Sequence, residues 1–269
     1  MSSFSPDWLK LREPYDVRSR NSKVFEAVAT FLRPRSSVRI ADLACGTGSN
    51  FRTLSPHLPA MQSWKLIDKD IGLLKRATAT PLSKHIALTA MPLDLHRDLE
   101  AALDGPIDLV TTSALLDLVS GTWLDRLARA LAARSAPFYA ALSYDGRTGF
   151  ARPDPFDAAI AAGVNAHQRM DKGFGPSLGP AAAAFIIARF KALGYSVVHG
   201  VSDWVMGPDD RDIQTEILAG WASAAHHTAA LSVADATAWL SRRHAEVAAG
   251  HSSLYVGHVD FFAIPSATR

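Results

Sequence analysis

The chain has 269 residues, of which 48% are hydrophobic and 20% are charged, a composition typical of a globular protein with a sizeable core. Lys and Arg number 28 against 26 Asp and Glu, which gives a formal net charge of +2 without a run of five like charges. This balance disfavours a nucleic-acid face built on a basic stripe, and the single cysteine, Cys45, excludes an internal disulfide framework.

The N-terminal stretch MSSFSPDWLKLREPYD carries charges where a signal peptide has an apolar core. No apolar run reaches the roughly 18 to 20 residues that a membrane span needs. We therefore expect one cytoplasmic domain over residues 1–269 without a membrane partner. An N-terminal amphipathic helix is predicted within residues 1–35.

From residue 37 onward, strand and helix patterns alternate. Apolar strands are predicted from residue 37 to Asp42 and over 63–68, 85–94, 106–115 and 136–144. Helices are predicted between them over 48–55, 70–79, 96–103 and 118–134. Strands joined by helical crossovers indicate an α/β fold with a parallel sheet and helices on both faces.

The alternation breaks at residues 145–179, which are rich in Gly and Pro and show no pattern of a long helix. A loop of this length in a compact domain is usually functional, so we expect a substrate lid there. A second cap insertion is expected at 207–250. The elements predicted after the lid are a helix from Pro180 to Gly194, a strand over 195–204, helices over 209–227 and 232–249, and a strand over 252–264.

The last two strands are expected to form an antiparallel hairpin at the edge of the sheet. An edge strand of this kind can pair with a second copy of the chain, which leaves a homodimer open.

The strongest functional signal is ADLACGTGSN, residues 41–50. Gly46 and Gly48 turn a predicted strand into a helix, and a backbone without Cβ atoms can approach a ligand closely beside the free N–H groups of the helix. Phe51 stands where a dinucleotide-binding motif has its third glycine, so NAD is disfavoured.

Three acids end successive predicted strands. Asp42 precedes the glycines, and Asp68 follows them by about 20 residues, where a carboxylate can accept hydrogen bonds from both hydroxyls of a ribose. Asp94 ends the third strand, near the expected place of an adenine ring. Because the carboxyl ends of parallel strands share one edge of the sheet, we expect the three carboxylates to face one crevice.

These motifs resemble those of class I S-adenosylmethionine-dependent methyltransferases of the small-molecule type, over about residues 20–144 and the last two strands. The first motif of that family matches Asp42 to Gly48, with Ala44 where the family usually has glycine. The resemblance implies a Rossmann-like, mostly parallel, seven-stranded sheet and S-adenosylmethionine as the cofactor. The cofactor-binding residues it implies are Arg20, Asp42, Ala44, Cys45, Gly46, Gly48, Asn50, Asp68, Lys69, Asp94, Leu95 and Ser113.

Within this resemblance, Asp68 holds the ribose, and Asp94 with Leu95 holds the adenine. Arg20, with Arg18 as the second choice, neutralises the carboxylate of the cofactor, because a guanidinium grips a carboxylate with two hydrogen bonds. The alternative for Arg20 is a solvated helix start.

The acceptor site is expected over the ends of the fourth and fifth strands, where NAHQRMDKGFG forms a dense polar cluster. His167 is the candidate base, with Asp171 or Asp145 to orient it, and Tyr144 is a further catalytic candidate. The alternative is a solvated loop with local turns. Candidate substrate contacts are Leu116, Asp145, Arg147, Asn165 and Lys172.

We expect no catalytic metal, because the histidines lack ligand spacing. The leading functional hypothesis is methyl transfer to a small molecule by in-line displacement, which mainly requires alignment of the reactants. A polymer acceptor, RNA or protein, is the second hypothesis. Against it, Thr112-Ser113-Ala114-Leu115 lacks the Pro-Pro signature of base-methylating enzymes. A cofactor-binding module without catalysis is the third.

Overall fold

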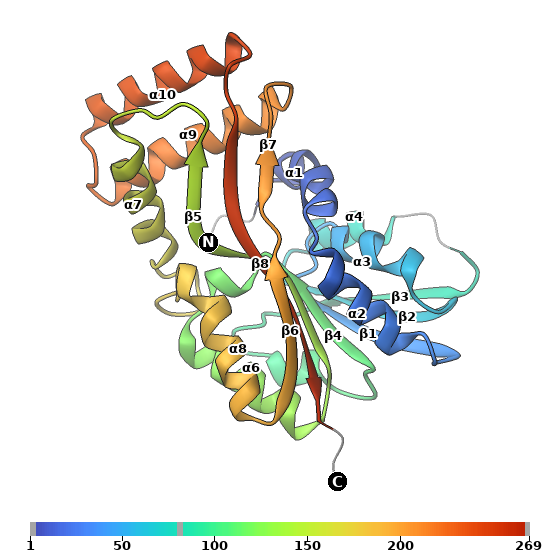
Figure 1. Ribbon diagram of the computed structural model, residues 1–269. Coiled ribbons are helices and arrows are strands. Elements are labelled where there is room, and N and C mark those ends of the chain that lie inside the picture. Colours follow the sequence, from blue (N-terminus) through green and yellow to red (C-terminus); the bar gives the residue numbers. More distant parts are fainter. Residues whose placement is uncertain (1–3, 80–82, 267–269) are drawn as a thin grey trace.

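The computed structural model describes residues 4–79 and 83–266 and has an α/β architecture (Figure 1). Its strands are β1 Ser37–Leu43, β2 Met61–Asp68, β3 Ile86–Pro92, β4 Leu109–Ser113, β5 Phe138–Phe150, β6 Tyr195–Val201, β7 Trp204–Met206 and β8 Leu254–Pro265. They form one sheet in the order β3-β2-β1-β4-β5-β8-β6, and β7 also pairs with β8.

Strands β1 to β5 pair in parallel, whereas β8 runs antiparallel to β5, β6 and β7. This confirms the mostly parallel sheet with antiparallel C-terminal strands. The described sheet has eight strands instead of seven, because the segment predicted as one strand over 195–204 is interrupted before β7 begins. The last two predicted strands pair in antiparallel fashion at one edge of the sheet, as expected, with β6 outermost and β8 between β5 and β6.

Helices cover both faces of the sheet. Their bounds are α1 Pro6–Arg18, α2 Ser22–Leu32, α3 Ser49–Leu54, α4 Ile71–Thr78, α5 Leu99–Ala102, α6 Gly121–Ala133, α7 Asp157–Gln168, α8 Ala182–Ala192, α9 Arg211–His227 and α10 Val233–Ala248. One apolar cluster includes side chains of α2, α3 and α4, and a second includes side chains of α5, α6 and α8. Strand β1 contributes Ile40 to the first cluster and Leu43 to the second, as expected for a strand buried on both faces.

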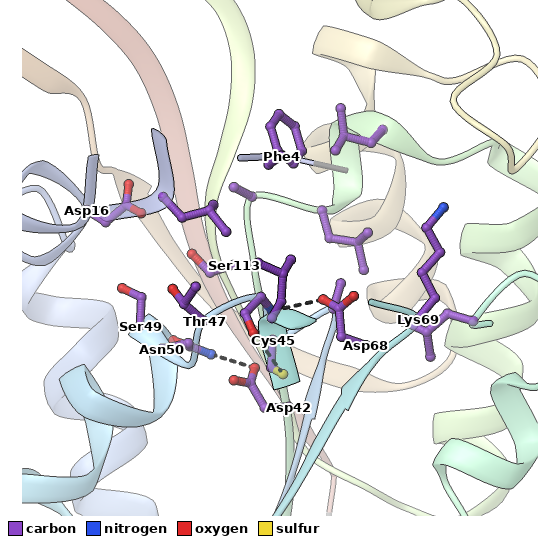
Figure 2. Close-up of a pocket in the computed structure, with 18 of the residues that line it drawn as sticks. Phe4, Asp16, Asp42, Cys45, Thr47, Ser49, Asn50, Asp68, Lys69 and Ser113 are labelled. Atoms are coloured by element: carbon purple, nitrogen blue, oxygen red, sulfur yellow. Dashed lines mark hydrogen bonds between the residues drawn. The ribbon is translucent and has the colours of Figure 1, made fainter. Parts of the chain in front are cut away.

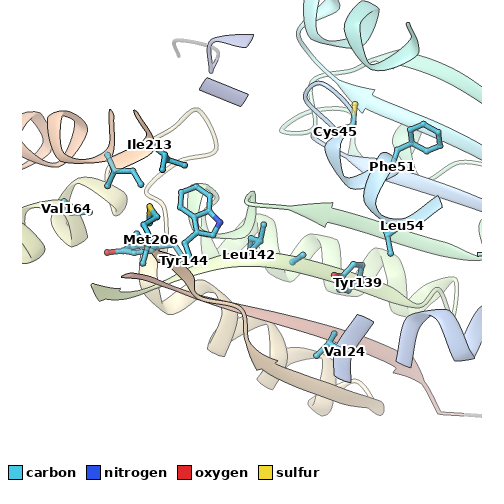
Figure 3. Close-up of a cluster of buried hydrophobic side chains, with 14 of the residues drawn as sticks. Val24, Cys45, Phe51, Leu54, Tyr139, Leu142, Tyr144, Val164, Met206 and Ile213 are labelled. Atoms are coloured by element: carbon cyan, nitrogen blue, oxygen red, sulfur yellow. The ribbon is translucent and has the colours of Figure 1, made fainter. Parts of the chain in front are cut away.

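The remaining helices α7, α9 and α10 form a cap at one end of the molecule, beside the far ends of β5, β7 and β8 (Figure 1). Val164 of α7 and Ile213 of α9 belong to the same buried cluster as Val24 of α2 and Tyr139 of β5 (Figure 3). The cap and one face of the sheet therefore share a continuous apolar core.

Two predictions for residues 145–179 are wrong. Strand β5 continues to Phe150 instead of ending at 144, and α7 occupies part of the segment expected to lack a long helix. Gly163 makes this helix hard to predict from the sequence, because glycine is a poor helix former. In the fold it is a packing contact, since a Cβ at Gly163 would lie 2.5 Å from the Ala225 Cα of α9.

The bounds of two other predicted helices differ less from those in the structure. The predicted N-terminal helix is two helices, α1 and α2, separated at residues 19–21, and its first three residues lie outside the described part of the chain. The helix predicted over 96–103 is limited to the short α5, because Asp94 begins a turn that occupies the residues before it.

Contacts to the cap end of the sheet hold α1 in place. The Tyr15 hydroxyl donates to Asp210 Oδ1 at 2.8 Å, and Arg18 Nη2 donates to the Val205 carbonyl at 2.8 Å. The rings of Trp8 and Trp204 meet edge to face with centroids 6.4 Å apart. These contacts fix one face of α1 beside the carboxyl ends of β1 and β4.

Candidate functional site

The turn after β1 is built from left-handed backbone. Ala44, Gly46 and Gly48 have φ angles of +53°, +55° and +83°. A Cβ at Gly48 would lie 3.1 Å from the Ala77 Cβ, so this glycine also lets the turn pack closely against α4. The helix that follows, α3, begins at Ser49.

This turn forms the floor of a pocket at the carboxyl edge of the parallel strands (Figure 2). Most of the predicted cofactor residues line it together, although they come from β1, β2, β3, β4 and the segments that follow them. These residues are Asp42, Ala44, Cys45, Gly46, Asn50, Asp68, Lys69, Asp94, Leu95 and Ser113. The expected convergence of the three carboxylates on one hollow is therefore observed.

Asp42 is the most deeply buried of the three acids and has no exposed surface. Its Oδ1 accepts a hydrogen bond from Asn50 Nδ2 at 3.0 Å, while its buried Oδ2 has no hydrogen-bond partner among the described residues (Figure 2). Burial raises the pKa of Asp42 to about 7, against the lowering effects of the Asn50 hydrogen bond and the nearby Arg20 charge. An unpartnered acceptor beside a pocket suits a donor group on a ligand.

Asp68 ties the glycine turn to the start of α4. Its Oδ2 accepts from the Gly46 N–H at 2.9 Å, and its Oδ1 accepts from the Asp70 N–H at 2.9 Å. Each carboxylate oxygen can accept more than one hydrogen bond, so two further donors can be held at this position. The carboxylate is fixed by backbone before a ligand arrives.

Asp94 lies at the rim of the pocket, with 37% of its side chain exposed. Its Oδ1 accepts from the His96 N–H at 3.0 Å, and its Oδ2 lies 3.6 Å from Arg97 Nε. The neighbouring Leu95 is buried, and its carbonyl accepts from Trp123 Nε1 at 2.8 Å. The pair thus offers one partly solvated carboxylate beside an apolar wall.

Arg20 does not line the main pocket but reaches its wall. Arg20 Nη2 donates to Ser113 Oγ at 3.3 Å, and Ser113 lines the pocket. Arg20 Nε is buried without a partner, and within residues 4–79 and 83–266 this guanidinium takes part in no ion pair. Its charge is therefore available to a carboxylate. Arg18, the second choice, pairs instead with Asp210 at 3.0 Å.

Gly48 and Cys45 are the other two residues of the turn that were predicted to bind the cofactor. Gly48 shapes the turn without lining the pocket. Cys45 lines the pocket and is buried, and its burial raises the pKa of the thiol, which keeps the group protonated.

The sequence analysis missed the contribution of α1. Leu9, Arg12 and Asp16 line the pocket from successive turns of one helical face, and Phe4 precedes them. Arg12 and Asp16 form a two-point ion pair with distances of 3.0 and 3.1 Å. The spacing of these residues indicates a shared face, but only the docking of α1 on Trp204 shows which surface that face covers. Further pocket residues that were not predicted are Thr47, Ser49, Leu73, Leu93 and Leu118, and Ala114, Leu115 and Phe174 also line the pocket.

Of the predicted substrate contacts, Lys172 lines the pocket. Leu116 is fully buried in the core. Asp145 and Arg147 pair with each other at 2.6 Å, and Arg147 also pairs with Asp203 at 2.8 Å. This network joins β5 to the turn between β6 and β7 and does not line the pocket.

The predicted catalytic residues Tyr144, His167 and Asp171 do not line the pocket. Tyr144 is buried, and its hydroxyl donates to Asn165 Oδ1 at 2.8 Å. His167 Nδ1 lies 3.4 Å from Lys172 Nζ. Asp171 accepts from the Gly173 N–H at 2.6 Å in a local turn.

The structure therefore does not bring Asp171 or Asp145 to His167. Lys172 stands between His167 and the pocket, so the base role predicted for His167 requires Lys172 as an intermediary.

Among residues 4–79 and 83–266, no group of three or more His, Cys, Asp or Glu side chains has an arrangement that could hold a metal ion. In the same part of the chain, no helix is both long and apolar enough to cross a membrane.

Solved structures with the same arrangement of helices and strands place this architecture among known folds. The cyclopropane-fatty-acyl-phospholipid synthase-like protein from Lactobacillus casei is 14% identical over 98% of this chain and 94% of that chain, with a TM-score of 0.56. A candidate methyltransferase from Bacillus halodurans is 11% identical over 91% and 100% of the two chains, with a TM-score of 0.50. The YcgJ protein from Bacillus subtilis is 12% identical over 92% and 100%, also with a TM-score of 0.50. No protein-family model and no curated protein matches this chain.

Proposed function

Because the chain has the Rossmann-like fold of class I methyltransferases, we propose that it transfers a methyl group from S-adenosylmethionine to a small-molecule acceptor. The observation that carries this proposal is the convergence of Asp42, Asp68 and Asp94 on one pocket around a two-glycine turn. The three carboxylates follow successive parallel strands, where open α/β sheets bind their ligands.

The residues present fit the groups of this cofactor. Asp68 would hold the two ribose hydroxyls, and Asp94 with Leu95 would hold the adenine. Asp42, through its unpartnered Oδ2, would accept a hydrogen bond from the amino group, and Arg20 would pair with the carboxylate. The cofactor, when bound, supplies an electrophilic methyl group on a sulfonium sulfur.

The contribution of the protein to such a reaction is alignment and exclusion of water. Side chains of α1, together with Lys172 and Phe174, line the pocket along with the glycine turn. An in-line displacement gains most from holding the reacting atoms in place, so a walled pocket suits it. A pocket closed in this way favours a small acceptor over an RNA or protein chain.

The ribose assignment is tested with the Asp68→Ala and Asp68→Asn variants. We expect both to bind S-adenosylhomocysteine about tenfold to a hundredfold more weakly than the wild type, because charge-assisted hydrogen bonds are lost. Isothermal titration calorimetry measures the affinity, and circular dichroism checks that the variants fold. Asp104→Asn, which changes an exposed acid away from the pocket, is the matched control. Near wild-type affinity in folded Asp68 variants would contradict the assignment.

A further inference from the structure

We propose that Lys172 binds an acidic group, a carboxylate or a phosphate, on the methyl acceptor. This inference rests on the proposed function and names the class of acceptor for the same pocket. It follows from three features of the structure: the position of Lys172, the lack of a counter-ion for it, and the apolar walls beside it.

The segment that carries Lys172 is held across the pocket by contacts on its C-terminal side. Ser177 Oγ donates to the Leu118 carbonyl at 2.9 Å, and Leu178 N–H donates to the Val119 carbonyl at 3.0 Å. The Phe174 ring packs edge to face on Trp123 with centroids 5.3 Å apart. These contacts fix residues 174–178 against the segment that follows β4, and they place Lys172 in the wall of the pocket.

The ammonium group of Lys172 has no acidic partner. Within the described ranges 4–79 and 83–266, this residue takes part in no ion pair, and its Nζ contacts His167 Nδ1 at 3.4 Å. Burial lowers the pKa of His167, with further lowering by Lys172 and His227. An imidazole carries no negative charge, so His167 cannot serve as a counter-ion for the ammonium group.

A partly buried ammonium without a counter-ion carries a desolvation cost. That cost is visible as a lowered pKa for Lys172, for which burial is the cause. An acidic group on a ligand would supply the missing charge and recover part of this cost. A neutral ligand of the same shape would not supply this charge and would not recover the desolvation cost.

Three of the four acids that line the pocket are engaged by other groups, and the fourth, Asp42, is fully buried. Asp16 pairs with Arg12, Asp94 faces Arg97, and Asp68 accepts two backbone N–H groups. Beside Lys172, the lining residues Phe4, Leu118 and Phe174 are apolar. The pocket therefore suits a small molecule with an apolar body and one acidic group.

The test compares acids with their neutral counterparts on protein saturated with S-adenosylhomocysteine. The probes are phenylacetate, benzoate, octanoate and phenylphosphonate, and each carboxylate is paired with its primary amide. We expect at least one acid to bind the wild type about tenfold or more tightly than its neutral counterpart in isothermal titration calorimetry. Lys172→Gln should remove this preference and leave the affinity for S-adenosylhomocysteine unchanged.

Two further variants separate a specific contact from general charge. Lys172→Arg should retain the preference for acids, because it keeps the positive charge. Lys191→Gln, which removes an exposed charge on α8, should also retain it. If the wild type binds S-adenosylhomocysteine but no acid more tightly than its amide, or if Lys172→Gln keeps the preference, the inference is overturned and the proposed function stands. If S-adenosylhomocysteine itself does not bind, the proposed function fails.

Discussion

At the scale of single residues, two alanines that line the pocket have a backbone conformation that alanine rarely adopts. Ala44 and Ala114 line the pocket with φ angles of +53° and +51°. The left-handed conformation costs a residue with a Cβ roughly 1–2 kcal/mol. Ala44 therefore has a backbone conformation that favours glycine, although the residue is alanine.

Replacing Ala44 by glycine should therefore stabilise the protein. The relief of left-handed strain exceeds the extra backbone entropy of glycine, so we expect the free energy of unfolding to rise by about 0.5–1 kcal/mol. Urea denaturation measures the change. Ala41→Gly, in the extended backbone of β1, should instead lower the stability. A loss of stability in Ala44→Gly would show that the turn is not strained.

The buried carboxyl of Asp42 predicts a pH dependence of stability. It titrates near 3.8 when unfolded and near 7 when folded, because burial disfavours the charged form. Between these pH values the folded protein holds a proton that the unfolded chain has lost. The contribution of Asp42 to the free energy of unfolding therefore falls as the pH rises from about 4 to about 7.

Asp42→Asn lacks this titration, so its stability relative to the wild type should improve as the pH rises from about 4 to about 7. Chemical denaturation at each pH measures the free energy of unfolding of the variant and of the wild type. In the difference between the two values, the contributions of other titrating groups cancel. A constant difference for Asp42→Asn would rule out the raised pKa.

The sequence was a good guide to single residues where the motif is local. The turn from Asp42 to Gly48 and the acids Asp68 and Asp94 could be placed because each follows a strand of a regular alternation. The roles of Asp145 and Arg147 could not be judged, because Asp203, which engages Arg147, lies on a distant turn. Arg12 and Asp16 were missed because their helix gains its position only from tertiary contacts.

At the scale of elements, the crossing of α7 and α9 depends on Gly163. Gly163→Ala would place a Cβ 2.5 Å from the Ala225 Cα, so the two helices would have to separate. We expect a loss of about 1–3 kcal/mol in the free energy of unfolding. Gly220→Ala is the matched control in α9, where an added Cβ meets nothing within 4 Å.

That control should gain up to about 1 kcal/mol, because alanine is the better helix former. Thermal or urea denaturation measures both variants, and equal effects would contradict the packing role of Gly163. The same glycine explains why α7 was not predicted. An alanine-rich segment with an internal glycine shows no clear apolar stripe, and its helical structure is stabilised by the neighbouring helix.

At the scale of the whole molecule, the order of the strands could be anticipated in outline. Alternating strands and helices predicted the parallel part, because right-handed crossovers leave few arrangements. The C-terminal part was less predictable, since an antiparallel strand can join the sheet at its edge or inside it. The cytoplasmic location, the homodimer and the division into a core with two cap insertions stay predictions.

The place of β8 has a consequence for how the protein is made. Residues 254–265 form β8, which lies between β5 and β6 and also pairs with β7. These three strands are therefore synthesised before the strand with which they all pair. Until that segment leaves the ribosome, β5 presents an open side to other chains. The nascent protein is therefore exposed to mispairing from the synthesis of β5 until that of β8, and completion of the sheet joins segments far apart in the chain.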